Sequence, residues 1–274
     1  MKTQRKNSET RLLHSPLELV LGQVKFSKID NLDSFIPTLK DEFRVMRFPL
    51  QNDLVRTKVT FNLTGQVEKT EDVKQWTFRT KDGSGLVILD EAQVAFQRTE
   101  YRSFEDFTET FNAVLEKILS VTDHRRNGLV QRIGLRYANS ISHRTPDRRP
   151  EYYLKKEFLG VCDDVFKENT KALGGLTVGK TNLTNGREGT LAVRIMTALG
   201  VKVPPDLQEF ATPPSPEDQN VQFTLLDLDH SWTGSMDLEK LENRMDDVFV
   251  DLHEKINEVF FGHLVTKGAM EEWR

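Results

Sequence analysis

The segment spanning residues 76–141 constrains the fold more than any other part of the chain. It alternates apolar and polar residues in short runs, continues with an amphipathic helical pattern and returns to an alternating run, which is typical of antiparallel strands that bury one face. Residues 81–85 include an Asp-Gly pair, which supplies the positive φ angles that a hairpin turn needs. The segment therefore predicts a meander of strands with a helix packed on it, and its residue types indicate no reaction.

The helical part of this segment begins at Ser103. Asp106 follows three residues later, so each side chain can accept a hydrogen bond from the other residue's free backbone amide, as in a capping box. An apolar stripe then recurs at helical spacing and is wide enough to cover one face of a sheet. The stripe consists of Phe104, Phe107, Phe111, Val114, Leu115 and Ile118.

The residues before and after this helix also predict regular structure. Residues 17–29 are rich in Leu and Val and predict a buried strand, and residues 30–44 predict a short helix. We expect Asp33 or Ser34 to cap that helix, because their side-chain oxygens can accept from its free amides. After the capped helix, the run 129–141 predicts a strand that places apolar and basic side chains on opposite faces.

Composition limits the class of protein. The 274 residues can form two modest domains, and 37% apolar and 29% charged residues are ordinary for a globular protein. A net charge of -4 is too small to select a partner. The single cysteine, Cys162, cannot form an internal disulfide, and no run approaches the ~20 apolar residues of a membrane span. We therefore expect a cytoplasmic protein that is neither secreted nor inserted in a membrane.

The chain divides at residues 143–150, HRTPDRRP, which combine two prolines with three arginines and predict a linker. We expect a polar leader at residues 1–16, an N-terminal half at 17–142 and a C-terminal half at 151–274. The expected fold class is α+β, with two related halves that each contain a mostly antiparallel sheet and amphipathic helices packed on one face.

The second half shows an order of elements similar to the first. An Asn-Gly pair predicts the turn of a hairpin between residues 176–183 and 190–198. Residues 221–228 predict a strand, and residues 238–259 predict a long amphipathic helix. Each half therefore runs from a strand through a polar corner into an amphipathic helix, an order that a duplicated unit would explain.

Three strings stand out within these elements: RIGLRYANSI at residues 132–141, LLDLDHSW at 225–232 and LVTKGAMEEW at 264–273. With the order of the surrounding elements, they resemble a sporadically distributed, uncharacterised prokaryotic protein family. The resemblance spans nearly the whole chain and departs at residues 1–15, which we expect to be an extension. It implies a cytoplasmic two-part α+β protein without an assigned activity, and it brings no catalytic residues.

Residues 174–181, GGLTVGKT, match the phosphate-binding pattern G-x-x-x-x-G-K-[ST], in which Gly179, Lys180 and Thr181 would hold nucleotide phosphates and magnesium. That mechanism needs a buried strand before the loop and a helix directly after it, because the helix supplies oriented amides. The flanks are the polar run FKENTKAL and an Asn-Gly turn, and neither fits. We interpret the segment as a glycine-tolerant strand and keep a nucleotide-binding enzyme as the less favoured alternative.

Three residues at the end of the predicted strand 221–228, and directly after it, have metal-binding side chains. Asp227 and Asp229 would lie on one face of that strand, beside His230. We favour ion pairs with arginine or a cap at a sheet corner, because no second ligand group accompanies them, and we expect no metal or other cofactor. His253 has no second histidine four residues later and is interpreted as part of a solvated helix face.

Arginines concentrate between residues 124 and 149, where only Asp123 and Asp147 oppose them. Clustered arginine can bind the phosphates of nucleic acid, which makes a nucleic-acid-binding component the first alternative function. The other interpretation is that Arg132 and Arg136 pair with acids across the sheet. The members of the cluster are Arg125, Arg126, Arg132, Arg136, Arg144, Arg148 and Arg149.

These features together favour a non-enzymatic cytoplasmic binding or interaction protein, a component of a larger assembly that uses a groove between its halves. No set of nucleophile, base and orienting group can be assembled, so no catalytic residue is predicted. A protein partner is expected, and a homo-oligomer is compatible with the sequence. The candidate binding residues are Arg132, Arg136, Tyr137, Asn139, Arg125, Arg126, Asp229 and His230.

Overall fold

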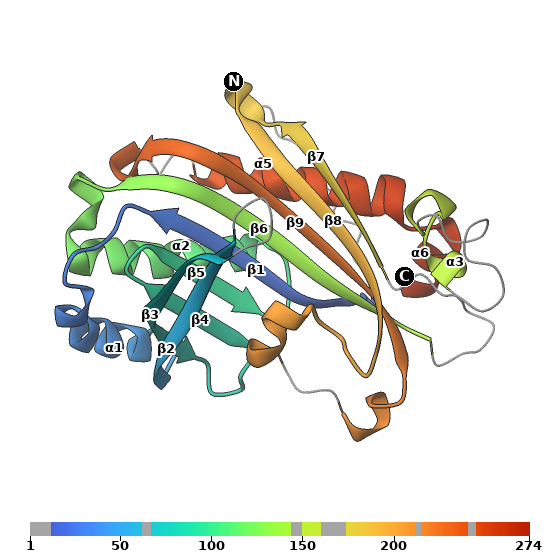
Figure 1. Cartoon of the computed structure of the whole chain (residues 1–274), viewed down its shortest axis with the longest axis horizontal. Helices are drawn as coiled ribbons and strands as arrows, with labels where there is room; N and C mark the ends of the chain where they lie inside the picture. The colour runs from blue at the N-terminus through green and yellow to red at the C-terminus, as the bar shows by residue number, and fades with distance from the viewer. Residues whose placement is uncertain (1–11, 62–66, 144–149, 160–173, 212–214, 241–244) are drawn as a thin grey trace.

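The computed structural model describes residues 12–61, 67–143, 150–159, 174–211, 215–240 and 245–274, and it has an α+β fold. Within these ranges, nine antiparallel strands form one sheet in the order β2-β3-β4-β5-β1-β6-β9-β8-β7 (Figure 1). The strands are β1 (Leu17–Phe26), β2 (Leu50–Phe61), β3 (Val67–Arg79), β4 (Gly85–Asp90), β5 (Gln93–Arg98), β6 (Leu129–Ser142), β7 (Gly174–Asn182), β8 (Glu188–Leu199) and β9 (Gln222–Asp237).

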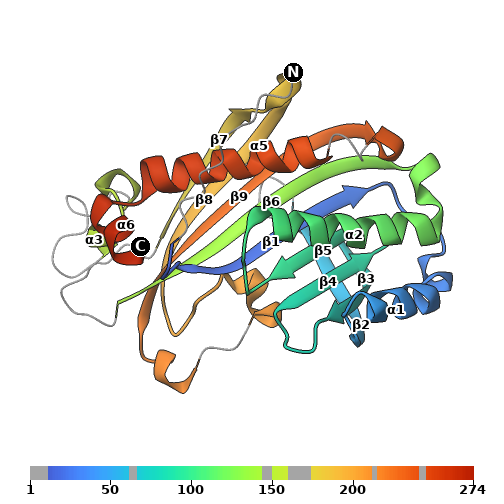
Figure 2. The same ribbon diagram turned by 180° about the vertical axis from the view of Figure 1, so that it is seen from behind.

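Three helices lie across one face of this sheet, as Figure 2 shows. They are α1 (Ile36–Val45), α2 (Phe104–Thr122) and α5 (Met245–Asn257). A π-helix (Glu258–Leu264) continues α5 directly, and α6 (Lys267–Trp273) follows it. The short α3 (Pro150–Tyr153) packs beside α6.

The main hydrophobic core lies between the sheet and these helices. The apolar stripe predicted for α2 is buried, which confirms the helical periodicity. On β6, Ile133, Leu135 and Tyr137 are buried against the helices. Alternation along the strand places Arg132 and Arg136 on the opposite face, as predicted.

Side chains cap two of the helices, and the cap predicted at Ser103 is one of them. The Ser103 side chain accepts from the amide of Asp106 at the start of α2, and the Thr266 side chain accepts from the amide of Ala269 at the start of α6. The predicted cap of α1 is wrong: the helix begins after Phe35, with no side-chain cap. A preceding 3-10 turn occupies the region, so Ser34 bonds to the carbonyl of Asn31 instead.

The sheet is continuous across the predicted boundary between the halves. β6 from the first half pairs antiparallel with β9 from the second along most of their length, and one core extends through both parts. The ends of the predicted linker belong to the folded structure, because the amide of His143 donates to the carbonyl of Gln222 and Pro150 begins α3. Residues 144–149 lie outside the described residues. The fold is therefore α+β with one continuous sheet, and its division into two related halves stays a prediction.

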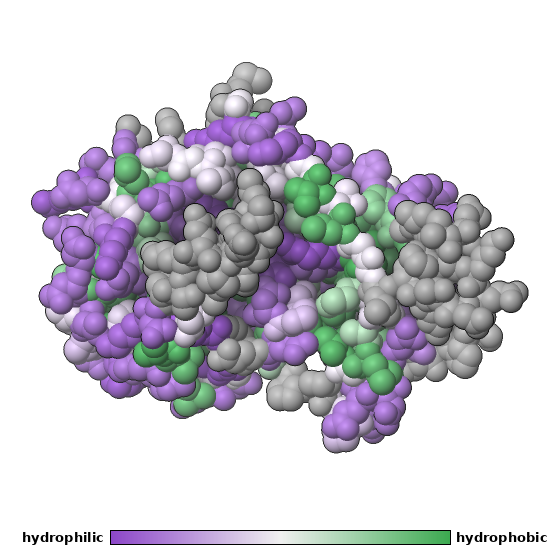
Figure 3. Space-filling view, in the orientation of Figure 1, coloured by the Kyte–Doolittle hydropathy of each residue, from purple (hydrophilic) through white to green (hydrophobic). Residues whose placement is uncertain are grey.

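The second face of the sheet carries no α-helix within the described ranges. A loop with a 3-10 turn (Pro205–Phe210) crosses it, and Val203 and Leu207 of this loop pack on Leu19 and Ala138. Figure 3 views the molecule from this side and shows hydrophilic surface in the middle of the face. The two faces of the sheet therefore differ in character: one is buried under helices, and the other is largely polar.

Candidate functional site

A pocket of about 870 Å³ opens on the helical side of the sheet, at the seam between β6 and α5. Pockets for organic ligands are typically roughly 300–1,000 Å³ in volume. We call it the seam pocket. It is lined by Leu12, Leu13, Ser15, Leu17, Thr99, Glu100, Tyr101, Arg102, Ser103, Tyr137, Asn139, Leu228, His253, Ile256, Asn257, Phe260 and Phe261.

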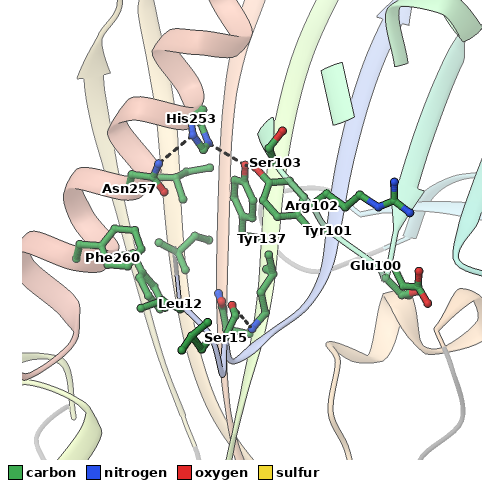
Figure 4. Close-up of a pocket in the computed structure, with 17 residues that line it drawn as sticks. Leu12, Ser15, Glu100, Tyr101, Arg102, Ser103, Tyr137, His253, Asn257 and Phe260 are labelled. Carbon is green, nitrogen blue, oxygen red and sulfur yellow. Dashed lines mark hydrogen bonds between the residues drawn. The ribbon is translucent and has the colours of Figure 1, made fainter. Parts of the chain in front are cut away.

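Four side chains in this pocket form a hydrogen-bonded chain, drawn in Figure 4. Nδ2 of Asn257 lies 2.9 Å from Nε2 of His253, Nδ1 of His253 lies 2.8 Å from the hydroxyl of Tyr137, and that hydroxyl lies 3.2 Å from the hydroxyl of Tyr101. Because a carboxamide nitrogen only donates, Nε2 accepts, and a neutral imidazole carries its proton on Nδ1. The chain therefore orients His253 and fixes its tautomer.

Packing holds the same histidine in place. His253 is 3% exposed, and its ring stacks on Phe104 with centroids 4.0 Å apart and planes 6° apart. It lies on the buried side of α5, beside Phe249, Leu252 and Ile256. Phe104 is the first residue of α2, so the ring contact joins the two long helices over the sheet.

The remaining walls combine apolar groups with a charged rim. The π-helix that continues α5 contributes Phe260 and Phe261, in a helix type that is rare and often occurs at functional sites. Glu100 and Arg102 come from the corner before α2, and in Figure 4 they point away from His253. The pocket thus has an aromatic and apolar interior with hydroxyl, imidazole and carboxamide groups on its floor.

Two of the predicted candidate residues, Tyr137 and Asn139, lie in the seam pocket. Both side chains are nearly buried, at 6% and 5% exposed. Nδ2 of Asn139 donates to the carbonyl of Leu226, on the neighbouring strand β9, at 3.2 Å. The other candidates lie elsewhere, so the structure does not bring the predicted set together.

Arg136 lies on the opposite face of the sheet, in a network of ion pairs. It makes two hydrogen bonds to Asp227, at 2.7 and 2.8 Å, and reaches Asp206 of the 3-10 turn at 2.6 Å. Arg194 also donates to Asp227, at 2.8 Å. Burial alone would lower the pKa of Arg136, but the hydrogen bonds to Asp206 and Asp227 raise it above its usual value. Arg136 therefore remains charged and ties the loop to the sheet.

Arg132 and Asp229 form the next pair on that face, at 3.3 Å, and Arg132 also donates to the side chain of Gln23. Asp227 and Asp229 do share a face, as predicted, and both pair with arginine, as the favoured interpretation has it. In the described residues, no three His, Cys, Asp or Glu side chains gather as they would around a metal ion.

His230 points to the helical side, away from these aspartates. Its Nδ1 lies 3.1 Å from the carbonyl of Leu252, and its Nε2 lies 2.7 Å from the hydroxyl of Thr181. The carbonyl can only accept, so Nδ1 carries the proton and Thr181 donates to Nε2. Burial lowers the pKa of His230 below 6.5. His230 links β9, α5 and β7.

The rest of the predicted basic cluster is dispersed. Arg125 donates to Glu116 of α2, and Arg126 lies 3.8 Å from Asp123 with its side chain 80% exposed. Arg144, Arg148 and Arg149 lie outside the described residues. The ion pairs predicted for Arg132 and Arg136 are confirmed, and the described Arg125 and Arg126 also have acidic neighbours, which the sequence did not predict.

The Gly-Lys-Thr string lies on an edge strand. Residues 174–182 form β7, which pairs antiparallel with β8, and Lys180 pairs with Glu188 at 2.9 Å. The segment that follows Thr181 is a 3-10 turn at Thr184–Gly186 rather than a helix. The interpretation of this segment as a strand is confirmed, and Gly179, Lys180 and Thr181 form no phosphate loop.

The interpretation of His253 as part of a solvated face is wrong, since it is among the most buried polar residues. Sequence reasoning also missed Tyr101 and Asn257. A signal was present: His253 lies four residues before Asn257 and three before Ile256, so it falls beside the apolar stripe of α5 rather than opposite it. What it contacts depends on β6 and cannot be read from the helix.

Within the described ranges, no helix has the length and apolar character needed to cross a membrane. Neither a scan against protein-family models nor a search of curated proteins found a match to this chain. Function must therefore be inferred from the site itself.

Proposed function

We propose that this protein is a non-enzymatic binding protein, a component of a larger protein assembly in the cytoplasm, whose seam pocket holds an apolar segment of a protein partner. The hydrogen-bonded chain on the pocket floor carries this proposal. Hydroxyl and carboxamide groups there can bond to a peptide group, while Ile256, Phe260 and Phe261 bury an adjoining apolar side chain.

The arrangement favours binding over catalysis. Both ring nitrogens of His253 already have partners, and the ring is stacked on Phe104, so the imidazole is fixed as a structural element. A general base needs a nitrogen that can reach the proton it removes. The seam pocket instead presents well-packed aromatic and apolar side chains, which are common in binding hot spots.

A protein segment fits the chemistry of the pocket better than a charged metabolite does. A buried phosphate or carboxylate needs a charged partner, and the described floor groups are hydroxyl, carboxamide and imidazole side chains, without a guanidinium or ammonium group. The nearest charged side chains, Glu100 and Arg102, point away from the floor. The lining also comes from both sides of the predicted boundary, which supports a binding surface between the two parts of the chain.

Comparative purification tests this proposal. Ser15 is exposed and lines the pocket, so Ser15→Trp would place an indole across it without altering the core. Ser120→Trp, at an exposed position on α2 outside the pocket lining, is the matched control. We expect a protein partner that is retained by the wild type and by the control, and lost with Ser15→Trp, when retained proteins are quantified by mass spectrometry. Identical partner sets for all three would contradict the proposal.

A further inference from the structure

A second concave region, of about 880 Å³, lies away from the seam pocket, between the end of α1, the turn from β3 to β4 and the end of β5. We call it the basic pocket. Five cationic side chains line it, Arg44, Arg47, Lys81, Arg98 and Arg102, against two carboxylates. It shares only Glu100 and Arg102 with the seam pocket, and none of its five cations is among the arginines that the sequence suggested for binding.

Arg47 occupies a backbone position that favours glycine. Its φ angle is +71°, in the left-handed region. The amide of Arg47 donates to the carbonyl of Arg44 at 3.1 Å, and the amide of Phe48 donates to the carbonyl of Phe43 at 2.8 Å. This is the Schellman pattern that ends many helices, in which glycine is the usual residue at the position of Arg47. A strained backbone position that holds a long cation points to a use for its side chain.

The cations of this pocket differ in their partners. Arg44 pairs with Asp41, and Arg98 pairs with Asp106. Within the described part of the chain, Arg47, Lys81 and Arg102 have no acid within ion-pair distance. They therefore differ from Arg125, Arg132 and Arg136, whose charges are met by Glu116, Asp229 and Asp227.

The two carboxylates of the lining have limited reach. Asp82 accepts from the hydroxyl of Thr80 at 2.6 Å and from the amide and hydroxyl of Ser84 at 3.0 and 2.9 Å. These hydrogen bonds lower the pKa of Asp82 to about 2, and they direct its charge into the turn. The second carboxylate, Glu100, lies two residues after the end of β5 and is exposed. Among the described residues, three cations without an ion-pair partner thus line one cavity, together with a single acid that no turn hydrogen bonds hold.

We propose that the basic pocket binds phosphate groups, either of a nucleotide or of a nucleic-acid backbone. Guanidinium and ammonium groups bind phosphate oxygens through charge-assisted hydrogen bonds. The one aromatic residue of the lining, Phe48, is 3% exposed and offers no ring face on which a base can stack. The site therefore recognises phosphate and not the base.

Isothermal titration calorimetry with inorganic pyrophosphate tests this site. Arg47→Gly removes the cation and relieves the backbone strain, so we expect binding at least about fivefold weaker with a melting temperature that is equal or higher. Lys267→Gln, which removes an exposed cation outside the pocket, should leave pyrophosphate affinity unchanged. Absence of binding at millimolar pyrophosphate, equal affinity in Arg47→Gly, or an equal loss in Lys267→Gln would overturn the proposal.

Two further ligands separate the sources of phosphate. ATP and a twelve-residue thymidine oligonucleotide would be titrated into the wild type and Arg47→Gly. Binding of ATP without binding of the oligonucleotide assigns the site to nucleotides. Tighter binding of the oligonucleotide, weakening steeply with salt, assigns it to a nucleic-acid strand. Either result supports a phosphate site if Arg47→Gly weakens the binding. Equal binding of both ligands by Arg47→Gly and by the wild type would overturn the proposal.

Discussion

The hydroxyl of Tyr137 lies 2.8 Å from Nδ1 of His253, although the two residues are 116 positions apart in the chain. β6 places the tyrosine under α5, and α5 turns the histidine toward the sheet. Each side chain satisfies a polar atom of the other in a setting that excludes water, since the two residues are 6% and 3% exposed. This contact forms the floor of the seam pocket and joins the two parts of the chain.

Removing one member of this pair should destabilise the protein. Tyr137→Phe keeps the ring but leaves Nδ1 of His253 without its buried partner, and we expect the free energy of unfolding to fall by about 1–3 kcal/mol. Tyr152→Phe is the control, because its hydroxyl is near the surface and lies 3.5 Å from the carbonyl of Gly268. Urea denaturation of both variants measures the difference, and equal stabilities would contradict a structural role for the Tyr137 hydroxyl.

The ion pairs of Arg136 should differ in strength according to burial. Its side chain is 11% exposed and that of Asp227 is 3%, whereas that of Asp206 is 63%. Arg136→Leu leaves the buried Asp227 carboxylate with Arg194 alone and should cost about 3 kcal/mol. Asp206→Asn breaks only an exposed pair and should cost about 1 kcal/mol or less. Chemical denaturation measures the loss of unfolding free energy in each variant. A larger loss for Asp206→Asn than for Arg136→Leu would contradict this order.

Stability should depend on pH through His230. Burial holds its folded pKa below 6.5, so the unfolded chain binds a proton more readily. The contribution of His230 to stability is therefore fully present above pH 6.5 and is lost as the pH falls from there toward the folded pKa. His230→Gln keeps a donor for Leu252 and an acceptor for Thr181 but does not titrate, so the slope of the unfolding free energy against pH below 6.5 should decrease. The exposed His263→Gln is the control, and an unchanged slope in His230→Gln would refute this assignment.

The Gly-Lys-Thr string should play no part in nucleotide binding. Lys180 and Glu188 are 67% and 61% exposed on an edge hairpin, so Lys180→Ala should change the free energy of unfolding by no more than about 0.5 kcal/mol. Affinity for MgATP, measured by calorimetry, should be the same in the variant and the wild type. Binding that occurs in the wild type and disappears in Lys180→Ala would restore the phosphate-loop interpretation.

Local features of the fold could be predicted from the sequence. The hairpin turn at residues 81–85, the capped α2 and the alternating β6 depend on residues within a few positions of one another. The cap of α1 was mispredicted because Asn31 offers Ser34 a competing carbonyl in a 3-10 turn. The local sequence pattern was sufficient to predict an element where no competing hydrogen bond of this kind formed.

The strand order and the sites depend on distant contacts. β1 lies between β5 and β6, and β6 meets β9 rather than its chain neighbour, so one sheet forms where the sequence favours two. The seam pocket exists because Tyr137 of β6 meets His253 of α5. The basic pocket depends on the left-handed backbone at Arg47, at a residue whose type gives no sign of it. Periodicity alone reveals none of these relationships.

The central claim is that the seam pocket is an open binding site for apolar groups, and equilibrium titration with the neutral dye N-phenyl-1-naphthylamine tests it most directly. The fluorescence of this dye increases in apolar surroundings. We predict saturable binding of one dye molecule to the wild type and to Ser120→Trp, and affinity at least about tenfold weaker in Ser15→Trp, whose indole would lie across the pocket. Equal affinity in all three proteins, or no saturable binding to the wild type, would contradict the claim.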